Sequence, residues 1–347
     1  MSNFKLTLTI VVICIAAIAG FGIYKMTGNN MEKTVIVYST HGESLLGAVA
    51  DAFEKETGIK VEYINVKGEL ADRVRAEKEN PQSDVMYGAP SSVFIELKNE
   101  DLFDPFVPSW AGVINPLFKD ADGYWIGTIQ TPVLMVYNSE MYSPEEAPAD
   151  WSDLADPKYR NKLVFRNALS SSARATFSAL LQQYDKRGEL EKGWEFLKMV
   201  DANTKQYYGS GSLLFQAIGR KEAGISFYVL NDTIDNKLKN NMPLEIVDAK
   251  SGSPVITDGI ALIKGAKHPN AAKAFIEFAG SAKTQSMLAN KFNRFPTHPA
   301  AIKDSPEWMA DIKFKAMDVD WGDLSKKQSE WMQKWDAEIK DSNKDKK

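Results

Sequence analysis

The sequence predicts an α/β fold built from two successive sets of alternating strands and helices. Residues 34–99 alternate between short β-branched runs and segments with apolar residues at helical spacing. A Pro-rich polar stretch, residues 143–157, interrupts the alternation, and a second set begins at Lys162. Alternating strands and helices favour parallel sheets with right-handed crossovers. The polar stretch is therefore a candidate domain boundary.

The length and composition are those of an ordinary globular protein with room for two domains. The chain has 347 residues, of which 44% are hydrophobic and 25% are charged, and its net charge is −4. This charge shows no basic excess, which argues against nucleic acid as a partner. The single cysteine, Cys14, lies in an apolar N-terminal run. The rest of the chain can therefore form neither a disulfide nor a thiolate metal site.

The N-terminal segment and linker, residues 1–31, predict export from the cytoplasm. An uncharged run, residues 6–24, lies between two lysines and would span roughly 28 Å as a helix, close to the hydrocarbon thickness of a membrane. An Ala-Ile-Ala triplet within it resembles the cleavage pattern of a secretory signal. Either a cleaved signal or an uncleaved membrane anchor fits this run.

The first set of elements opens with the stretch Thr34–Ser44. Its first half, Thr34–Tyr38, is β-branched and aromatic and predicts a buried strand, and its second half, Ser39–Ser44, is a polar turn. A helical pattern follows and stops at Gly58. Open α/β sheets present ligand groups in such turns, at the carboxyl ends of their strands. We therefore expect half of a binding cleft at this turn.

The same periodicities predict the remaining elements. In the first set they are strands at 61–66 and 84–87, a helix at 68–78, a polar turn at 88–92 that starts another helix, and two strand-like runs within 125–138 that are broken by Thr131-Pro132. In the second set they are strands at 162–166 and 224–230, and helices near 172–183, 189–200 and 213–219. An apolar strand at 255–264, helices at 269–279 and 282–291, and a charged helical tail from Pro306 complete the chain.

Three stretches of the sequence resemble one family. They are VIVYSTHGESLLGAVADAFEKETGIKVEYI from Val35, NPQSDVMYGAP from Asn80 and TDGIALIKGAKHPNAAKAFIEF from Thr257. Together they look like an ABC-transporter substrate-binding protein (periplasmic binding protein type 2), from the branch that contains ferric-iron, phosphonate and sugar-phosphate receptors. The resemblance covers the chain from Glu32 to the C-terminal helices. GxSxG, P-loop, HExxH and Rossmann glycine motifs are absent from the sequence, so the residues themselves show no catalytic constellation.

The resemblance implies a two-lobed fold in which two parallel-sheet lobes are joined by two hinge strands, near 131–138 and 255–264. Lobe 1 would be discontinuous, made of residues 32–133 and 256–347, and lobe 2 would comprise residues 134–255. The implied function is that of an extracytoplasmic receptor, a monomer and not an enzyme, which needs no cofactor. It would close on a small solute and deliver it to an ABC-transporter permease.

Serine-rich turns before helices favour a small anionic solute, such as an organophosphate or phosphonate. A helix start offers hydroxyls, free backbone N–H groups and the positive end of the helix dipole, although each serine could equally be an ordinary cap. Arg174, or Arg166 at a strand end, could add a charge-assisted contact, and Asp232 or Asp258 could hold an amino group. The predicted ligand-binding residues are Ser39, Thr40, His41, Ala89, Ser91, Ser170, Ser171, Ser172, Arg174, Ser210, Ser212, Tyr228, Asn231 and Asp232.

Ferric iron is an alternative ligand. His41 falls where the resemblance places a histidine ligand of the iron receptors, but Val229-Leu230 stands where their tyrosine pair would fall. Their glutamate is also missing, around Gly88-Ala89-Pro90. Aliphatic side chains cannot coordinate a hard cation, so iron would need His41 together with a displaced tyrosine, for which Tyr207-Tyr208 is the candidate pair.

A serine-type hydrolase is a more remote alternative, with Ser39 as nucleophile and His41 as base. One tight turn cannot easily place the hydroxyl on the imidazole and also leave room for an orienting acid. The residues therefore favour a solute receptor over an enzyme.

Overall fold

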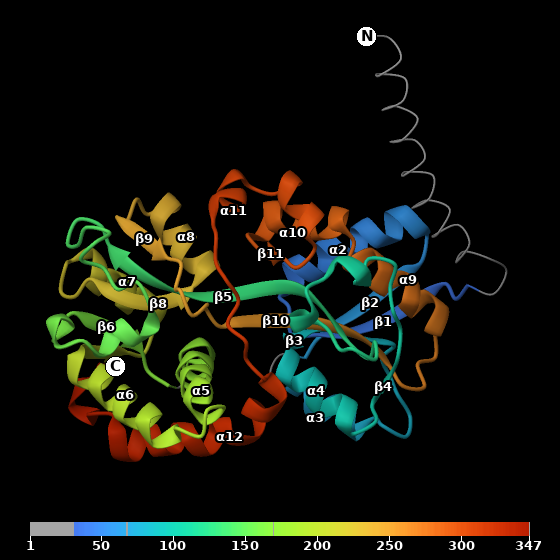
Figure 1. Cartoon of the computed structure of the whole chain (residues 1–347). Coiled ribbons are helices and arrows are strands. Elements are labelled where there is room, and N and C mark those ends of the chain that lie inside the picture. Colours follow the sequence, from blue (N-terminus) through green and yellow to red (C-terminus); the bar gives the residue numbers. More distant parts are fainter. Residues whose placement is uncertain (1–30, 67–68, 169, 347) are drawn as a thin grey trace, which may run out of the picture.

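The computed structural model describes residues 31–66, 69–168 and 170–346, arranged as in Figure 1. The predicted signal or anchor, residues 6–24, lies outside the described residues. Among the helices within the described ranges, none is both long enough and apolar enough to cross a bilayer.

One path of hydrogen-bonded strands connects the two halves of the molecule. The strands are β1 (Thr34–Ser39), β2 (Lys60–Asn65), β3 (Val85–Pro90), β4 (Phe103–Asp104), β5 (Ile126–Asn138), β6 (Leu163–Arg166), β7 (Thr204–Tyr208), β8 (Ile225–Val229), β9 (Leu244–Val247), β10 (Val255–Ile263), β11 (Phe295–Pro296) and β12 (Asp345–Lys346). Their order along the path is β12-β7-β6-β8-β5-β10-β3-β1-β2, and β4, β9 and β11 pair with β10 or β5 beside it. The predicted α/β class is confirmed.

The strands within each half are parallel, whereas the two strands that join the halves are antiparallel to their neighbours. β1 pairs in parallel with β2 and β3, and β6 pairs in parallel with β7 and β8. Between these groups lie β5 and β10, which pair antiparallel with each other, while β10 also pairs antiparallel with β3, and β5 with β8. The complete sheet is therefore mixed. We call the half around β1–β3 lobe 1 and the half around β6–β8 lobe 2.

β5 is one continuous strand of 13 residues, so the prediction of two separate runs is wrong. Its first part, up to Pro132, pairs with β10, and its second part, from Val133, pairs with β8 and β9. Pro132 lies where the strand exchanges one set of partners for the other, a position that tolerates a missing N–H group. β5 and β10 thus run between the lobes, where the resemblance placed the hinge strands.

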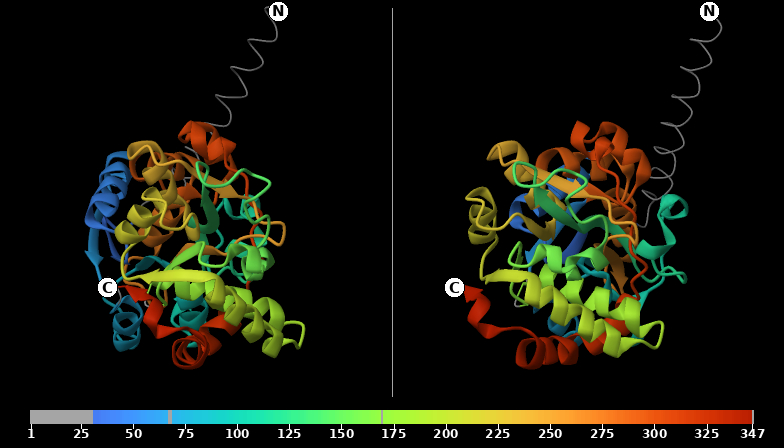
Figure 2. Two further views of the ribbon diagram at one scale, coloured as in Figure 1. Left: turned by 90° about the vertical axis from the view of Figure 1, so that its left-hand side faces the viewer. Right: turned by 60° about the vertical axis from the view of Figure 1, so that its left-hand side comes forward.

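Helices flank the sheet on both faces (Figure 2). They are α2 (Glu43–Thr57), α3 (Leu70–Ala76), α4 (Ser91–Asn99), α5 (Ser171–Asp185), α6 (Leu190–Asn203), α7 (Gly211–Gly219), α8 (Leu230–Lys239), α9 (Pro269–Ala279), α10 (Ala282–Phe292), α11 (Glu307–Asp311) and α12 (Trp321–Lys334). Short 3-10 turns lie at Ala111–Val113, Pro116–Phe118, Trp151–Ala155, Pro157–Tyr159, Pro299–Asp304 and Ser342–Lys344, and a π turn lies at Trp335–Ile339. The sequence analysis did not predict β7, β9 or α8.

Each lobe has its own aromatic core. In lobe 1, the ring of Phe53 from α2 packs edge-on against Phe275 of α9, with the centroids 5.3 Å apart. In lobe 2, Phe165 of β6 stacks on Phe227 of β8 with the centroids 4.7 Å apart. Separate cores are what a two-lobed protein needs if the lobes move as bodies.

The end of the C-terminal tail, from Met317, packs with the core of lobe 2. Trp335, just after α12, stacks on Phe177 of α5 with the ring centroids 4.9 Å apart. β12 pairs with β7, and the ammonium of Lys344 lies 3.0 Å from the carboxylate of Asp201 at the end of α6. Residues 256–347 were all predicted to belong to lobe 1, and this packing differs because apolar side chains of the charged tail, among them Trp331 and Met332, lie in the lobe 2 core.

Candidate functional site

A cavity of about 510 Å³ lies between the two lobes. Its walls come from the starts of α4 and α5, from β10 and from α12. The polar residues on the first three of these elements are Ser91, Ser92, Ser171, Ser172, Arg174 and Asp258. We call this space the interlobe cavity. It brings together four of the predicted ligand-binding residues, one from lobe 1 and three from lobe 2.

The starts of α5 and α4 both lack a side-chain cap. Ser170 makes no capping bond, because its hydroxyl and that of Ser172 hydrogen-bond with each other at 3.1 Å. α4 begins after Pro90, which has no side-chain acceptor, and Ala89 before it has a φ of 79°, a strained conformation that is common at binding sites. The first N–H groups of a helix have no partner within the helix. These donors can therefore bind an anion.

Ser210, by contrast, is an ordinary helix cap. Its hydroxyl accepts a hydrogen bond of 3.2 Å from the backbone N–H of Leu213 at the start of α7. For Ser210 the alternative interpretation, that the serine only caps a helix, therefore applies.

Arg174 places a cation on the wall formed by the start of α5. Its backbone N–H donates to the carbonyl of Ser170 at 2.9 Å, as in any first helical turn. Within the part of the chain that the structure describes, its guanidinium has neither a hydrogen bond nor an ion pair. The charge is therefore available to a ligand.

Asp258 lies at an irregular point of β10. The pairing of β10 with β3 and β5 changes register next to this residue, and such bulges re-aim a side chain. A Cβ at Gly259 would lie 2.8 Å from the ring of Phe94, so the glycine lets α4 pack directly on the bulge. Burial raises the pKa of Asp258 to about 7, although the positive charge of Arg294 acts in the opposite direction.

Ser39 and His41, in the turn after β1, are buried beside the end of β3. The N–H of His41 donates to Ser39 Oγ at 3.0 Å, and the imidazole packs edge-on against Tyr87 with the ring centroids 4.8 Å apart. A Cβ at Gly88 would lie 2.9 Å from both His41 Nε2 and Thr40 Oγ1. Among the described residues, His41 Nε2 and the hydroxyl of Tyr87 are buried without a hydrogen-bond partner. Within the described residues the only hydrogen bond between Ser39 and His41 comes from the backbone N–H of His41, and its Nε2 has no partner, so the hydrolase hypothesis has no hydroxyl–imidazole pair to build on.

The environment of His41 fixes its charge. Burial lowers the pKa of His41 to about 3, and the positive charge of Arg294 contributes in the same direction. The imidazole is therefore neutral at neutral pH, so it can donate or accept a hydrogen bond but supplies no positive charge to an anion.

Replacement of His41 by glutamine should reduce the acid sensitivity of the protein. The folded-state pKa of about 3 lies below the ordinary value of 6.5, so the unfolded chain takes up the proton first, and stability is lost as the pH falls from about 6.5 to 3. We expect the free energy of unfolding of the wild type to fall by a few kcal/mol more than that of His41→Gln between pH 7 and 4. Urea unfolding at both pH values measures this difference; equal losses would contradict a neutral buried imidazole.

A second cavity, of about 720 Å³, lies between α7 and α8 in lobe 2 and is lined by Ser212, Tyr228 and Asp232. Tyr228 and Val229 end β8 and point to opposite faces of the strand, so Val229 lines the interlobe cavity instead. Arg166 donates to the hydroxyl of Tyr228 at 3.2 Å and to two backbone carbonyls, which occupies its guanidinium. Seven of the predicted binding residues are thus divided between these two cavities.

Arg294, between α10 and β11, is a residue that the sequence analysis missed. Its Nε is buried without a hydrogen-bond partner among the described residues. Burial lowers the pKa of His41 in lobe 1 and raises those of Asp258 on the hinge strand and Asp232 in lobe 2, and the positive charge of Arg294 acts to lower all three pKa values. The charge of Arg294 therefore acts on groups in both lobes and on the hinge strand. Arg294 and Asn231 together line a small cavity. No motif in the sequence marks Arg294, because only the tertiary fold brings it to these groups.

The tyrosines considered as iron ligands are engaged elsewhere. The hydroxyl of Tyr207 donates to Asp201 at 2.8 Å and that of Tyr208 donates to Glu222 at 3.2 Å, in each case within lobe 2. Among the residues that the structure describes, no group of three or more His, Cys, Asp or Glu side chains is arranged to hold a metal ion.

Comparison with known proteins identifies the class. Residues 80–325 match the model of the bacterial extracellular solute-binding protein family. The chain is 30% identical over 321 residues to the probable ABC transporter periplasmic-binding protein y4fP of Sinorhizobium fredii, with 89% of this chain and 87% of the relative covered. The chain therefore belongs to the bacterial extracellular solute-binding protein family, and it is a solute receptor of an ABC transporter.

Two further similarities concern relatives with different ligands. The chain is 28% identical over 273 residues to a periplasmic protein of Salmonella typhimurium named for 2-aminoethylphosphonate binding, with 74% of this chain and 77% of the relative covered. The crystal structure of apo ferric ion-binding protein A from Pasteurella haemolytica is similar with a TM-score of 0.74 at 23% identity, and 90% of this chain and 99% of that chain are covered. The second likeness shows the periplasmic-binding-protein fold and nothing about the ligand.

Proposed function

We propose that this receptor binds a small anionic solute of the organophosphate or phosphonate class in the interlobe cavity. The observation that carries the proposal is that the uncapped start of α5 and the unpaired guanidinium of Arg174 face the same cavity. Free N–H groups with the helix dipole stabilise negative charge, and so do charge-assisted hydrogen bonds from arginine. Ser91 and Ser92 add a second helix start from lobe 1, so one anion can contact both lobes.

The transport cycle follows from this arrangement. The lobes close by bending at β5 and β10, and the closed form delivers the solute to an ABC-transporter permease. In our proposal lobe 1 is formed by residues 32–133 and 256–316, and lobe 2 by residues 134–255 and 317–346. The protein acts outside the cytoplasm as a monomer, with residues 6–24 as its signal or anchor. It performs no covalent chemistry and needs no cofactor.

The remaining predicted residues act around the anion site. The buried turn of Ser39, Thr40 and His41 supports the start of α4 through Gly88 and Ala89. Ser212, Tyr228 and Asp232, which line the second cavity, and Asn231 beside Arg294 complete the lobe 2 side of the cleft.

Ferric iron is the second candidate ligand, and the contact between His41 and Tyr87 favours it. Their rings touch, and His41 Nε2 and the Tyr87 hydroxyl are both buried without partners among the described residues. Against this candidate, burial raises the pKa of Tyr87, which disfavours the tyrosinate that iron requires, and the nearby charge of Arg294 repels a cation. Addition of ferric citrate should therefore produce no visible tyrosinate-to-iron absorption band.

Thermal unfolding with a panel of solutes tests the ligand class. A ligand that binds only the folded protein at a hundred times its Kd adds about 2.7 kcal/mol of stability, which raises Tm by several degrees. We expect this rise with methylphosphonate, 2-aminoethylphosphonate or glycerol 3-phosphate, and no rise with glucose or with sodium chloride at matched ionic strength. A flat response to all three anionic compounds would overturn the proposed class.

A further inference from the structure

The C-terminal helix α12 is shared between the two lobes. Trp331 and Met332, in its second half, belong to the core of lobe 2. Its first turn instead contacts α4 of lobe 1, since a Cβ at Gly322 would lie 2.9 Å from Cγ2 of Ile95. In Figure 1 the helix runs below α5 and reaches α4. It therefore spans the gap between the lobes at a place away from the hinge strands.

One face of α12 lines the interlobe cavity. Trp321, Leu324, Ser325 and Gln328 are the helix residues on its wall, and their i, i+3, i+4, i+7 spacing is that of a single helix face. The hydroxyl of Ser325 donates to the carbonyl of Gly322 at 2.9 Å, so it is already engaged. The side-chain amide of Gln328 has no hydrogen bond to any residue of the described chain. It is thus a free donor and acceptor facing the cavity.

The α5 and α12 walls of the cavity differ in charge. The α5 wall carries Arg174 and a helix start, whereas the α12 wall carries an indole, an aliphatic chain, a hydroxyl and a carboxamide. One water molecule takes about 30 Å³ of liquid volume, and a tetrahedral oxyanion is only a few times larger. It therefore fills a small part of the interlobe cavity, whose volume is about 510 Å³. The space beside the anion site is therefore large enough for an uncharged body attached to the anion.

We propose that α12 is the wall that selects the uncharged part of the solute, with Gln328 as a specificity-determining residue that hydrogen-bonds a polar group there. This inference rests on the proposed anion site and narrows its substrate class. The solute is an organic phosphate or phosphonate with a body of several carbon atoms that carries a hydrogen-bonding group, and not an inorganic oxyanion.

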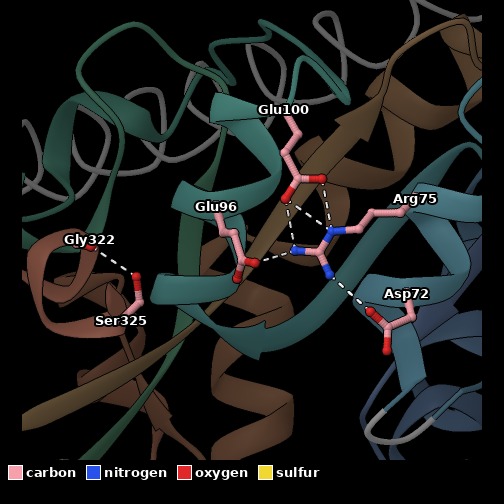
Figure 3. Close-up of polar contacts among 6 residues, drawn as sticks. All are labelled: Asp72, Arg75, Glu96, Glu100, Gly322 and Ser325. Atoms are coloured by element: carbon pink, nitrogen blue, oxygen red, sulfur yellow. Dashed lines mark hydrogen bonds and ion pairs between the residues drawn. The ribbon is translucent and has the colours of Figure 1, made fainter. Parts of the chain in front are cut away.

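Ion pairs hold α4, the lobe 1 helix that contacts α12, against α3 (Figure 3). Arg75 of α3 lies 2.8 Å from Glu100, next to the end of α4, and 3.0 Å from Asp72 of its own helix, and it also pairs with Glu96 of α4. The figure shows the first turn of α12, with Gly322, beside α4. A wall that discriminates between solutes needs such a fixed position, because a misplaced hydrogen-bonding group contributes little selectivity.

Titration calorimetry with two phosphate monoesters tests the role of Gln328. Methyl phosphate supplies the anion alone, and glycerol 3-phosphate adds a body with hydroxyl groups. We expect Gln328→Ala to weaken glycerol 3-phosphate binding about five- to tenfold, the effect of one hydrogen bond, and to change methyl phosphate binding by less than twofold. Gln333→Ala is the matched control, because Gln333 is exposed on the same helix and does not line the cavity; it should change neither affinity.

Each other outcome overturns the inference in a distinct way. If Gln328→Ala lost affinity equally for both esters, Gln328 would support the fold and would not recognise the body of the solute. If the variant lost affinity for neither ester, the body would bind elsewhere. If the wild type binds the two esters equally tightly, the selective wall is overturned while the proposed anion site stands. If the wild type binds neither ester, the anion site itself is wrong, and the inference falls with it.

Discussion

Replacement of Arg174 by glutamine is expected to weaken phosphonate binding by about 10- to 100-fold. A hydrogen bond between charged groups contributes about 1.5–3 kcal/mol, and Arg174 shares its charge with no carboxylate in the described part of the chain. The Tm of the free protein should stay within about a degree, because the variant removes no hydrogen bond or ion pair of the described structure. Calorimetry with methylphosphonate and thermal unfolding measure the two quantities.

Arg160→Gln provides the control for a general effect of charge. Arg160 is exposed in lobe 2, away from the cavity, and its guanidinium also has no partner within the described ranges. The variant has the same net charge as Arg174→Gln, so a loss caused by the overall field of the protein would appear in both. Methylphosphonate affinity that is equal in the two variants would contradict an anion site at the start of α5.

The sequence predicted those features that depend on local chemistry. β1 and the polar turn after it follow from β-branched residues that give way to small polar ones. α9 was predicted with its observed bounds because Pro269 fits the first helical position and Gly280 follows the last. The serine turn at Ser170–Ser172 was found in the same way, since the start of a helix is a local signal.

The features that the sequence did not reveal depend on tertiary structure. β5 was divided at Pro132 because proline usually ends a strand, but here the strand changes partners at that residue. Arg294, in the short connection between α10 and β11, and Gln328, on α12, are single polar residues without a surrounding motif, and only the fold brings them to the cleft. The tail was assigned to lobe 1 by similarity, whereas Trp335 stacks on Phe177 and Trp331 lies in the same lobe 2 core.

Replacement of Asp258 by asparagine is expected to stabilise the protein at alkaline pH. The folded-state pKa of about 7 lies above the ordinary value of 3.8, so the folded protein retains the proton, and this stabilisation is lost as the pH rises from about 4 to 7. Asparagine does not ionise. We therefore compare the free energy of unfolding of Asp258→Asn with that of the wild type. The variant's value minus the wild-type value should rise by up to about 1.4 kcal/mol per pH unit between pH 4 and 7, and it should stay constant above pH 7. Urea unfolding from pH 5 to 8 measures it; a difference that does not change with pH would contradict the raised pKa.

The same carboxyl should determine whether the receptor prefers a solute with an amino group. Above pH 7 an ionised Asp258 in the interlobe cavity repels a simple anion but attracts an ammonium group attached to it. We expect the wild type to bind 2-aminoethylphosphonate at least tenfold more tightly than ethylphosphonate at pH 8, with a smaller ratio at pH 6. The comparison with Asp258→Asn removes the titration of the phosphonates themselves, because both proteins meet the same ligand forms at each pH. Asp258→Asn should lower the ratio at pH 8 to near one, and a ratio that persists in this variant would place the ammonium on another carboxylate, with Asp232 as the candidate.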